Sequence, residues 1–67
     1  MSYIIRSTKL TANQAVNKWL EEAFRDKRVV KYIQYMENTD TYKVELVNGT
    51  KPYILRSIPK VGWEILE

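Results

Sequence analysis

The spacing of apolar residues changes once along this chain of 67 residues, from a helical period to an alternation. Residues 12–27 repeat apolar side chains every three or four positions, which is typical of one amphipathic helix. From residue 29 onward apolar and polar side chains tend to alternate, which is typical of strands. A chain this short builds one small core and is expected to be a single domain, 1–67. Its helix therefore has to pack against a sheet.

The predicted helix has a well-marked start. Thr11 and Gln14 have the spacing of a capping box, in which each side chain accepts a hydrogen bond from an otherwise unpaired backbone N–H. Trp19 lies within the apolar stripe, so we expect it in the core. The stripe consists of Ala12, Ala15, Val16, Trp19, Leu20, Ala23 and Phe24.

Four strands are predicted after the helix, at 29–37, 41–47, 51–57 and about 62–66. The pair Asn48-Gly49 favours a type I′ hairpin turn, which needs a positive φ at both residues. Residues 3–6 predict a further strand, at an edge of the sheet or beside a central strand. The expected class is α+β, with one helix on a mainly antiparallel sheet of three or four strands. The order is β-α-β-β-β, with or without a short last strand.

The hairpins predict a register in which one face of the sheet is apolar. The expected pairs are Tyr35 with Tyr42, Ile33 with Val44, Val44 with Tyr53, Tyr42 with Leu55, Val47 with Thr50, and Lys31 beside Leu46. This register places Pro52 opposite Glu45, where a backbone N–H would be needed. A bulge or a late start of the strand at 51–57 would remove that conflict.

The residue types argue against catalysis. The chain has no histidine and no cysteine, so the commonest general base, the commonest metal ligand and any thiol nucleophile are missing. It has no glycine-rich phosphate loop and no metal-binding motif. We therefore expect no enzyme, no cofactor and no metal.

Positive charge is concentrated in the first half of the chain. The net charge is +3, and residues 1–31 carry seven basic against three acidic side chains. The register gathers Arg25, Lys27, Arg28, Lys31 and Lys51 into one basic rim, suited to phosphates or an acidic protein surface. The other interpretation is that the first three complement the helix end, while the two lysines cover the core edge.

The sheet face turned away from the helix is unusually apolar for a solvent-exposed face. Tyr32, Met36, Val47, Ile54 and Ile58 form the predicted patch, with Arg56 and Lys43 beside it. The remaining residues assigned to this face are Val30, Gln34, Glu45 and Pro52. Three explanations are open: the N-terminal strand or the C-terminal segment folds over the face, a protein partner or second copy binds it, or single-stranded nucleic acid stacks on it.

Trp63 has two interpretations, as a cap on one end of the core or as an exposed anchor for a partner. The segment MSYIIRSTKL lacks the apolar run of a signal peptide, and no stretch approaches the length of a membrane-spanning helix. We therefore expect a cytoplasmic protein with no membrane contact. The frequent Lys, Ile, Asn and Tyr residues favour a low-GC bacterium, or a phage or mobile element, as the source.

These observations predict a small non-enzymatic binding protein, a regulator or inhibitor that contacts another protein through its sheet face. Tyr32, Met36, Ile54 and Arg56 are the residues predicted to contact that partner, and a homodimer through the same face is the related option. The alternative is a nucleic-acid-binding protein that uses the basic rim.

Overall fold

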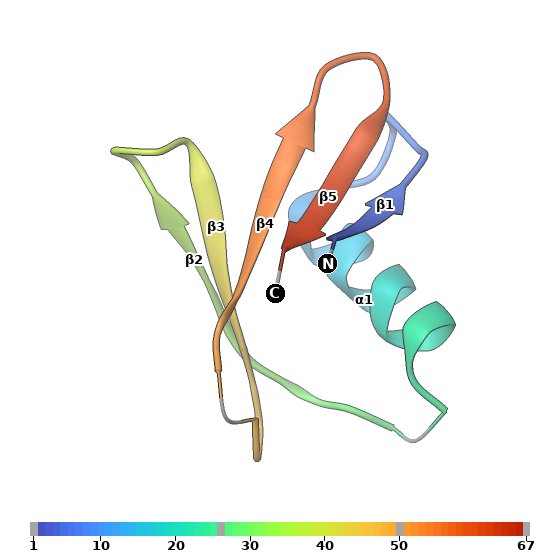
Figure 1. Cartoon of the computed structure of the whole chain (residues 1–67), viewed down its shortest axis with the longest axis vertical. Coiled ribbons are helices and arrows are strands. Elements are labelled where there is room, and N and C mark those ends of the chain that lie inside the picture. The colour runs from blue at the N-terminus through green and yellow to red at the C-terminus, as the bar shows by residue number, and fades with distance from the viewer. Residues whose placement is uncertain (1, 26, 50, 67) are drawn as a thin grey trace.

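The computed structural model describes residues 2–25, 27–49 and 51–66. It has one helix and a five-stranded antiparallel sheet (Figure 1), which confirms the predicted α+β class. The elements are β1 (Ser2–Ile5), α1 (Ala12–Ala23), β2 (Val30–Met36), β3 (Thr41–Leu46), β4 (Tyr53–Ile58) and β5 (Gly62–Leu66). Within the described ranges, no helix has the length and hydropathy needed to cross a membrane.

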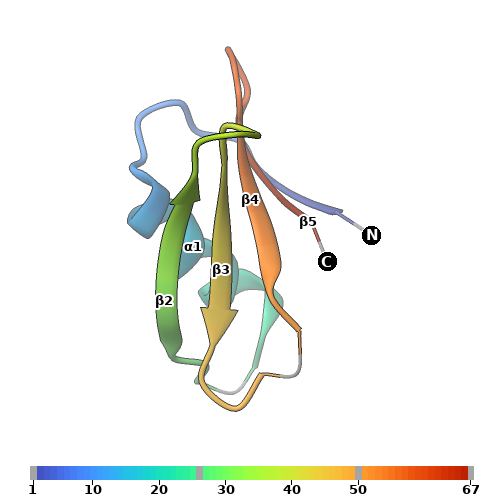
Figure 2. The same ribbon diagram turned by 90° about the vertical axis from the view of Figure 1, so that its left-hand side faces the viewer.

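The strand order in the sheet is β1-β5-β4-β3-β2. Strands β2 to β5 form consecutive antiparallel pairs, and β1 pairs antiparallel with β5. The sheet therefore has five strands rather than the three or four predicted, and β1 takes an edge position. Helix α1 connects the two edge strands, β1 and β2, and lies behind the sheet in Figure 2.

Helix α1 begins where the sequence predicts. The Thr11 Oγ1 accepts a hydrogen bond from the Gln14 N–H at 3.2 Å, and the Gln14 Oε1 accepts one from the Thr11 N–H at 3.0 Å. Its end is different, because the helix stops at Ala23 instead of residue 27. Phe24 is extended, with φ of −122°, and its ring packs edge-on against Trp19 at 5.4 Å. The tertiary contact overrides the helical spacing of the sequence.

The predicted strand pairs at the centre of the sheet are confirmed, and the errors lie at the strand ends. A bulge between Val30 and Tyr32 pairs Val30, rather than Lys31, with Leu46. Strand β4 starts only at Tyr53, which removes the conflict at Pro52. The predicted pair of Val47 with Thr50 lies outside the described residues.

The turn after β3 is not the predicted type I′ turn. The Gly49 N–H donates to the Leu46 carbonyl at 3.0 Å, so Val47 and Asn48 are its central residues. Asn48 has the positive φ, 64°, whereas Gly49 does not. Asparagine tolerates this left-handed conformation well, so the turn forms one residue earlier than its sequence suggests.

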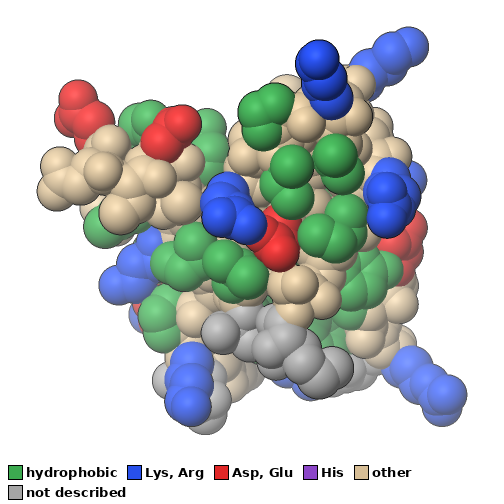
Figure 3. All heavy atoms as spheres, turned by 45° about the horizontal axis from the view of Figure 1, so that its top comes forward, with side chains coloured by type: hydrophobic (Ala, Val, Ile, Leu, Met, Phe, Trp, Pro, Cys, Tyr) green, Lys and Arg blue, Asp and Glu red, His purple; other side chains and the backbone are tan. Residues whose placement is uncertain are grey.

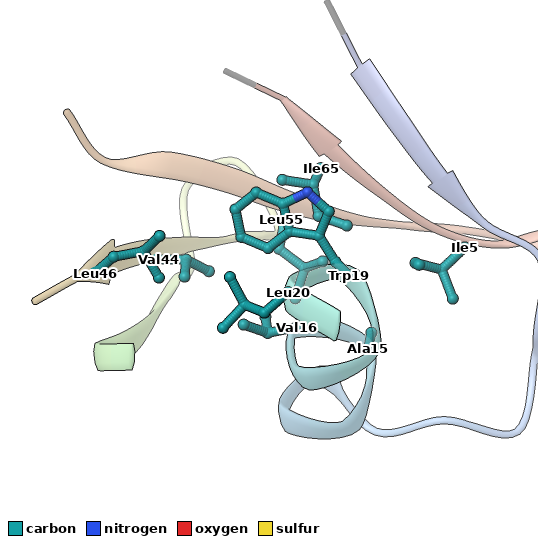
Figure 4. Close-up of a cluster of buried hydrophobic side chains, with 9 residues drawn as sticks. All are labelled: Ile5, Ala15, Val16, Trp19, Leu20, Val44, Leu46, Leu55 and Ile65. Atoms are coloured by element: carbon teal, nitrogen blue, oxygen red, sulfur yellow. The ribbon is translucent and has the colours of Figure 1, made fainter. Parts of the chain in front are cut away.

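The core lies between α1 and the sheet (Figure 4). Its buried members are Ile5, Ala15, Val16, Trp19, Leu20, Val44, Leu46, Leu55 and Ile65. Trp63 is half-buried against this core, and its Nε1–H donates to the Leu10 carbonyl at 3.1 Å. Trp63 therefore caps one end of the core, as the first of its two interpretations predicts.

Candidate binding surfaces

The first candidate surface is the side of the sheet opposite α1, here called the open face. Because strand residues alternate between faces, the neighbours of buried Val44, Leu55 and Ile65 belong to it. Its members are Ile4, Tyr32, Gln34, Met36, Thr41, Lys43, Glu45, Ile54, Arg56, Ile58, Glu64 and Leu66. No described helix or strand lies over this side of β2, β3 and β4 (Figure 2).

The N-terminal strand and the C-terminal segment do not fold over the open face, because both are strands within the sheet. This removes the first of the three explanations for the predicted apolar face. Ile4 and Met36 are exposed, while Tyr32, Ile54, Ile58 and Leu66 are half-buried. In Figure 3, where the top of Figure 1 is tilted toward the viewer, hydrophobic side chains surround a basic and an acidic side chain.

Three residues predicted on this face are placed elsewhere. The bulge turns Val30 toward the core, where it is half-buried opposite Leu46. Val47 lies beyond β3 in the turn, with its N–H donating to the Val29 carbonyl at 2.8 Å. Pro52 precedes β4 and takes no part in its pairing.

The open face gains two apolar residues, Ile4 and Leu66, that the sequence interpretation did not assign. Leu66 lies opposite Ile54 because the turn at 59–61 pairs β4 with β5. Extending the alternation through that turn would have found it. Ile4 lies opposite Glu64 only because β1 joins β5, a pairing that has no local signal in the sequence.

Acidic side chains on the open face are paired within the face. The Arg56 guanidinium donates to the Glu64 carboxylate, its cross-strand neighbour. The Tyr32 hydroxyl donates to the Glu45 carboxylate at 2.5 Å, and the Lys31 Nζ lies 3.7 Å from the same carboxylate. The face therefore combines apolar side chains with locally neutralised charges.

The contact between Tyr32 and Glu45 shifts the pKa values of both side chains. The hydrogen bond from Tyr32, with a smaller contribution from Lys31, lowers the pKa of Glu45 below its ordinary value. The same hydrogen bond raises the pKa of Tyr32 above its ordinary value, because it favours the protonated phenol beside a carboxylate.

Replacing Tyr32 with phenylalanine is expected to raise the pKa of Glu45 toward its ordinary value of 4.5. Because the folded-state pKa is lowered, this carboxylate stabilises the fold above its unfolded-state pKa and loses that effect as the pH falls through the folded-state value. The variant should lose less stability on acidification. Carboxyl-carbon NMR as a function of pH measures the pKa of Glu45. The matched control is Tyr35→Phe, because the Tyr35 hydroxyl donates to a different carboxylate, that of Asp40. An unchanged pKa of Glu45 in Tyr32→Phe would contradict the contact.

The second candidate surface, here called the basic cavity, lies where α1 ends. It has a volume of about 480 Å³, within the usual range of ligand sites. Its lining is Asn17, Leu20, Glu21, Phe24, Arg25, Lys27, Arg28 and Val29. The Arg28 guanidinium lies over the Phe24 ring, 4.5 Å from its centroid.

The structure brings only part of the predicted basic rim together. Arg25, Lys27 and Arg28 line the basic cavity. Lys31 instead pairs with Glu45 on the open face, because the bulge displaces it from its expected position beside Leu46. Lys51 is exposed in the connection before β4, outside the strand pairing predicted for it.

Comparisons with protein-family models, with curated proteins and with solved structures find no match to this chain.

Proposed function

We propose that this chain is a small protein-binding domain, a regulator or inhibitor that covers part of another protein with its open face. The supporting observation is that β1 and β5 extend the sheet, so that among the described residues no helix or strand covers the apolar side chains of that face. Those side chains are Ile4, Tyr32, Met36, Ile54, Ile58 and Leu66. Apolar patches rimmed by polar residues mark interaction sites on small proteins. We assign no catalytic role to any residue.

The exposed area of the chain supports this proposal. A folded protein of 8.0 kDa typically exposes about 4,450 Å². This chain exposes 5174 Å².

The charges of the open face favour a protein partner over a nucleic acid. The Arg56 guanidinium is engaged by Glu64, and Lys31 is paired with Glu45. The carboxylates beside these two cations lower the positive potential that a nucleic-acid backbone would meet, so the face offers apolar contact more than phosphate binding. The nucleic-acid alternative therefore rests on the basic cavity rather than on the sheet.

The open face can be tested by affinity capture from a lysate of a low-GC bacterium. Tyr32→Ala combined with Ile54→Ala is expected to lose the partner, because truncation removes two central apolar contacts. Asn13→Ala combined with Lys18→Ala, on the exposed side of α1, is the matched control and should retain it. Circular dichroism verifies that both variants fold. Equal recovery of every captured protein by both variants would contradict the proposal.

Light scattering after gel filtration distinguishes the partner from a second copy. A monomer is expected if the open face binds a different protein. A dimer that the Tyr32→Ala, Ile54→Ala variant converts to monomer would replace the proposal with self-association.

A further inference from the structure

The basic cavity combines positive charge with an apolar wall. Leu20, Phe24 and Val29 supply apolar surface, and Val29 is 61% exposed although it is a large hydrophobic residue. Arg25, Lys27 and Arg28 supply three positive charges against the single negative charge of Glu21 among the described lining residues. Such a lining is complementary to an acidic group that carries an apolar neighbour.

None of these cations lies within α1 itself. The last turn of α1 contains no basic residue, and the chain is already extended at Phe24. The favourable interaction of a cation with a helix end falls off within the last turn. The three cations instead lie in the connection between α1 and β2, around the basic cavity.

The basic cavity adjoins an edge of the sheet. Val29, part of its wall, directly precedes β2, which pairs only with β3 in the described sheet. The outer edge of β2 therefore offers backbone N–H and C=O groups to an added strand. The regular part of β2, from Tyr32 to Met36, is separated from the cavity by the bulge after Val30. An extended chain rises about 3.3 Å per residue, so a peptide of about eight residues spans the regular part of β2 and the basic cavity.

We propose that the β2 edge and the basic cavity together bind an extended acidic segment of a partner protein. The segment pairs with β2 as a sixth strand and places an apolar side chain against Phe24 and Val29. A flanking Asp or Glu meets Arg25 and Lys27. This site uses the outer backbone edge of β2 and the basic cavity, whereas the open face uses side chains such as those of Tyr32 and Met36, so variants in the cavity test it separately from the function proposed above.

A protein segment fits this lining better than a single-stranded nucleic acid. Among the described lining residues of the basic cavity, Phe24 has the one aromatic ring, and the Arg28 guanidinium already lies over it. Nucleic-acid sites of this kind need aromatic faces available for stacking. Glu21 in the wall further opposes a run of phosphates, whereas Leu20 and Val29 suit aliphatic side chains.

The experiment is a selection from a displayed library of random peptides of about ten residues, long enough to pair with β2 and reach the cavity. Acidic peptides with alternating apolar residues should be enriched. In fluorescence anisotropy, Arg25→Glu combined with Lys27→Glu should weaken the best peptide at least tenfold, because two attractive charges become repulsive. Lys9→Glu combined with Lys18→Glu, which changes the net charge equally outside the cavity, should change its Kd less than about threefold.

Two further probes test the strand pairing and the ligand class. The same peptide with alternate backbone amides N-methylated should lose binding, because it cannot complete the ladder with β2. An oligothymidylate of similar length should not displace the peptide. The proposal is overturned if no acidic peptide is enriched, if the Arg25→Glu, Lys27→Glu variant binds as well as the parent, if N-methylation has no effect, or if the oligothymidylate displaces the peptide. Loss of this site with an intact open-face contact would leave the proposed function standing.

Discussion

Replacing Gly62 with alanine is expected to lower the free energy of unfolding by about 2–6 kcal/mol. Gly62 begins β5 with a φ of 144°, a conformation that L-residues with a side chain rarely adopt, at a cost of about 1–3 kcal/mol. An added Cβ would also lie 2.0 Å from the Ile5 carbonyl oxygen and 2.6 Å from the Ser7 N. Relieving this overlap requires the β1 backbone to move, which adds about 1–3 kcal/mol.

Urea unfolding followed by circular dichroism measures the loss at Gly62, and Gly49→Ala is the matched control. Gly49 does not have a positive φ, and a Cβ there would lie 3.1 Å from the Leu46 carbonyl oxygen. We expect its effect to stay within about 1 kcal/mol. A loss at Gly62 as small as the loss at Gly49 would contradict the close approach of β1 and β5.

Replacing Trp19 with alanine should lower the free energy of unfolding by about 3–5 kcal/mol, the usual cost of emptying a large core site. Trp19 is 3% exposed, and its ring contacts Tyr53 and Phe24 edge-on at 4.8 and 5.4 Å. A domain of this size has a total stability of roughly 3–10 kcal/mol, so this loss is a large fraction of the total and should lower the urea midpoint far below that of the parent. Loss of the Trp19 ring should also release Phe24, which turns inward where α1 ends.

The loss at Trp19 is measured by urea unfolding, with the fluorescence of Trp63 as the remaining tryptophan signal. Trp19→Phe is the graded control, because it keeps an aromatic ring in the core and should lose clearly less stability. If Trp19→Ala were as stable as Trp19→Phe, the ring contacts to Tyr53 and Phe24 would not hold the core together.

The central elements of the fold could be predicted because their signals are local. The apolar stripe and the Thr11–Gln14 capping box fix where α1 begins, and the alternation of the following residues fixes the pairs Tyr35–Tyr42 and Ile33–Val44. The element boundaries were less predictable. Helix α1 ends early because Phe24 packs on Trp19. No residue type near the helix end indicates that contact in the sequence.

The residues of the candidate surfaces were likewise predictable where the signal was local and not where it depended on a bulge. Tyr32, Met36, Ile54 and Arg56 lie on the open face as their alternation predicts. The basic rim was only partly correct, since a bulge sends Lys31 to Glu45 while Arg25, Lys27 and Arg28 line the basic cavity. A bulge changes the face of every residue before it, and the sequence around Val30 does not reveal one.

The sequence by itself determined that one helix packs on an antiparallel sheet and which residues of β3 and β4 face the core, because periodicity is a property of neighbouring residues. Only the tertiary structure decided that the open face stays uncovered. The pairing of β1 with β5 joins residues from opposite ends of the chain, and it completes the sheet instead of covering it. Such a pairing depends on the backbone approach at Gly62 and on the core that α1 shares with both strands, which no local pattern encodes.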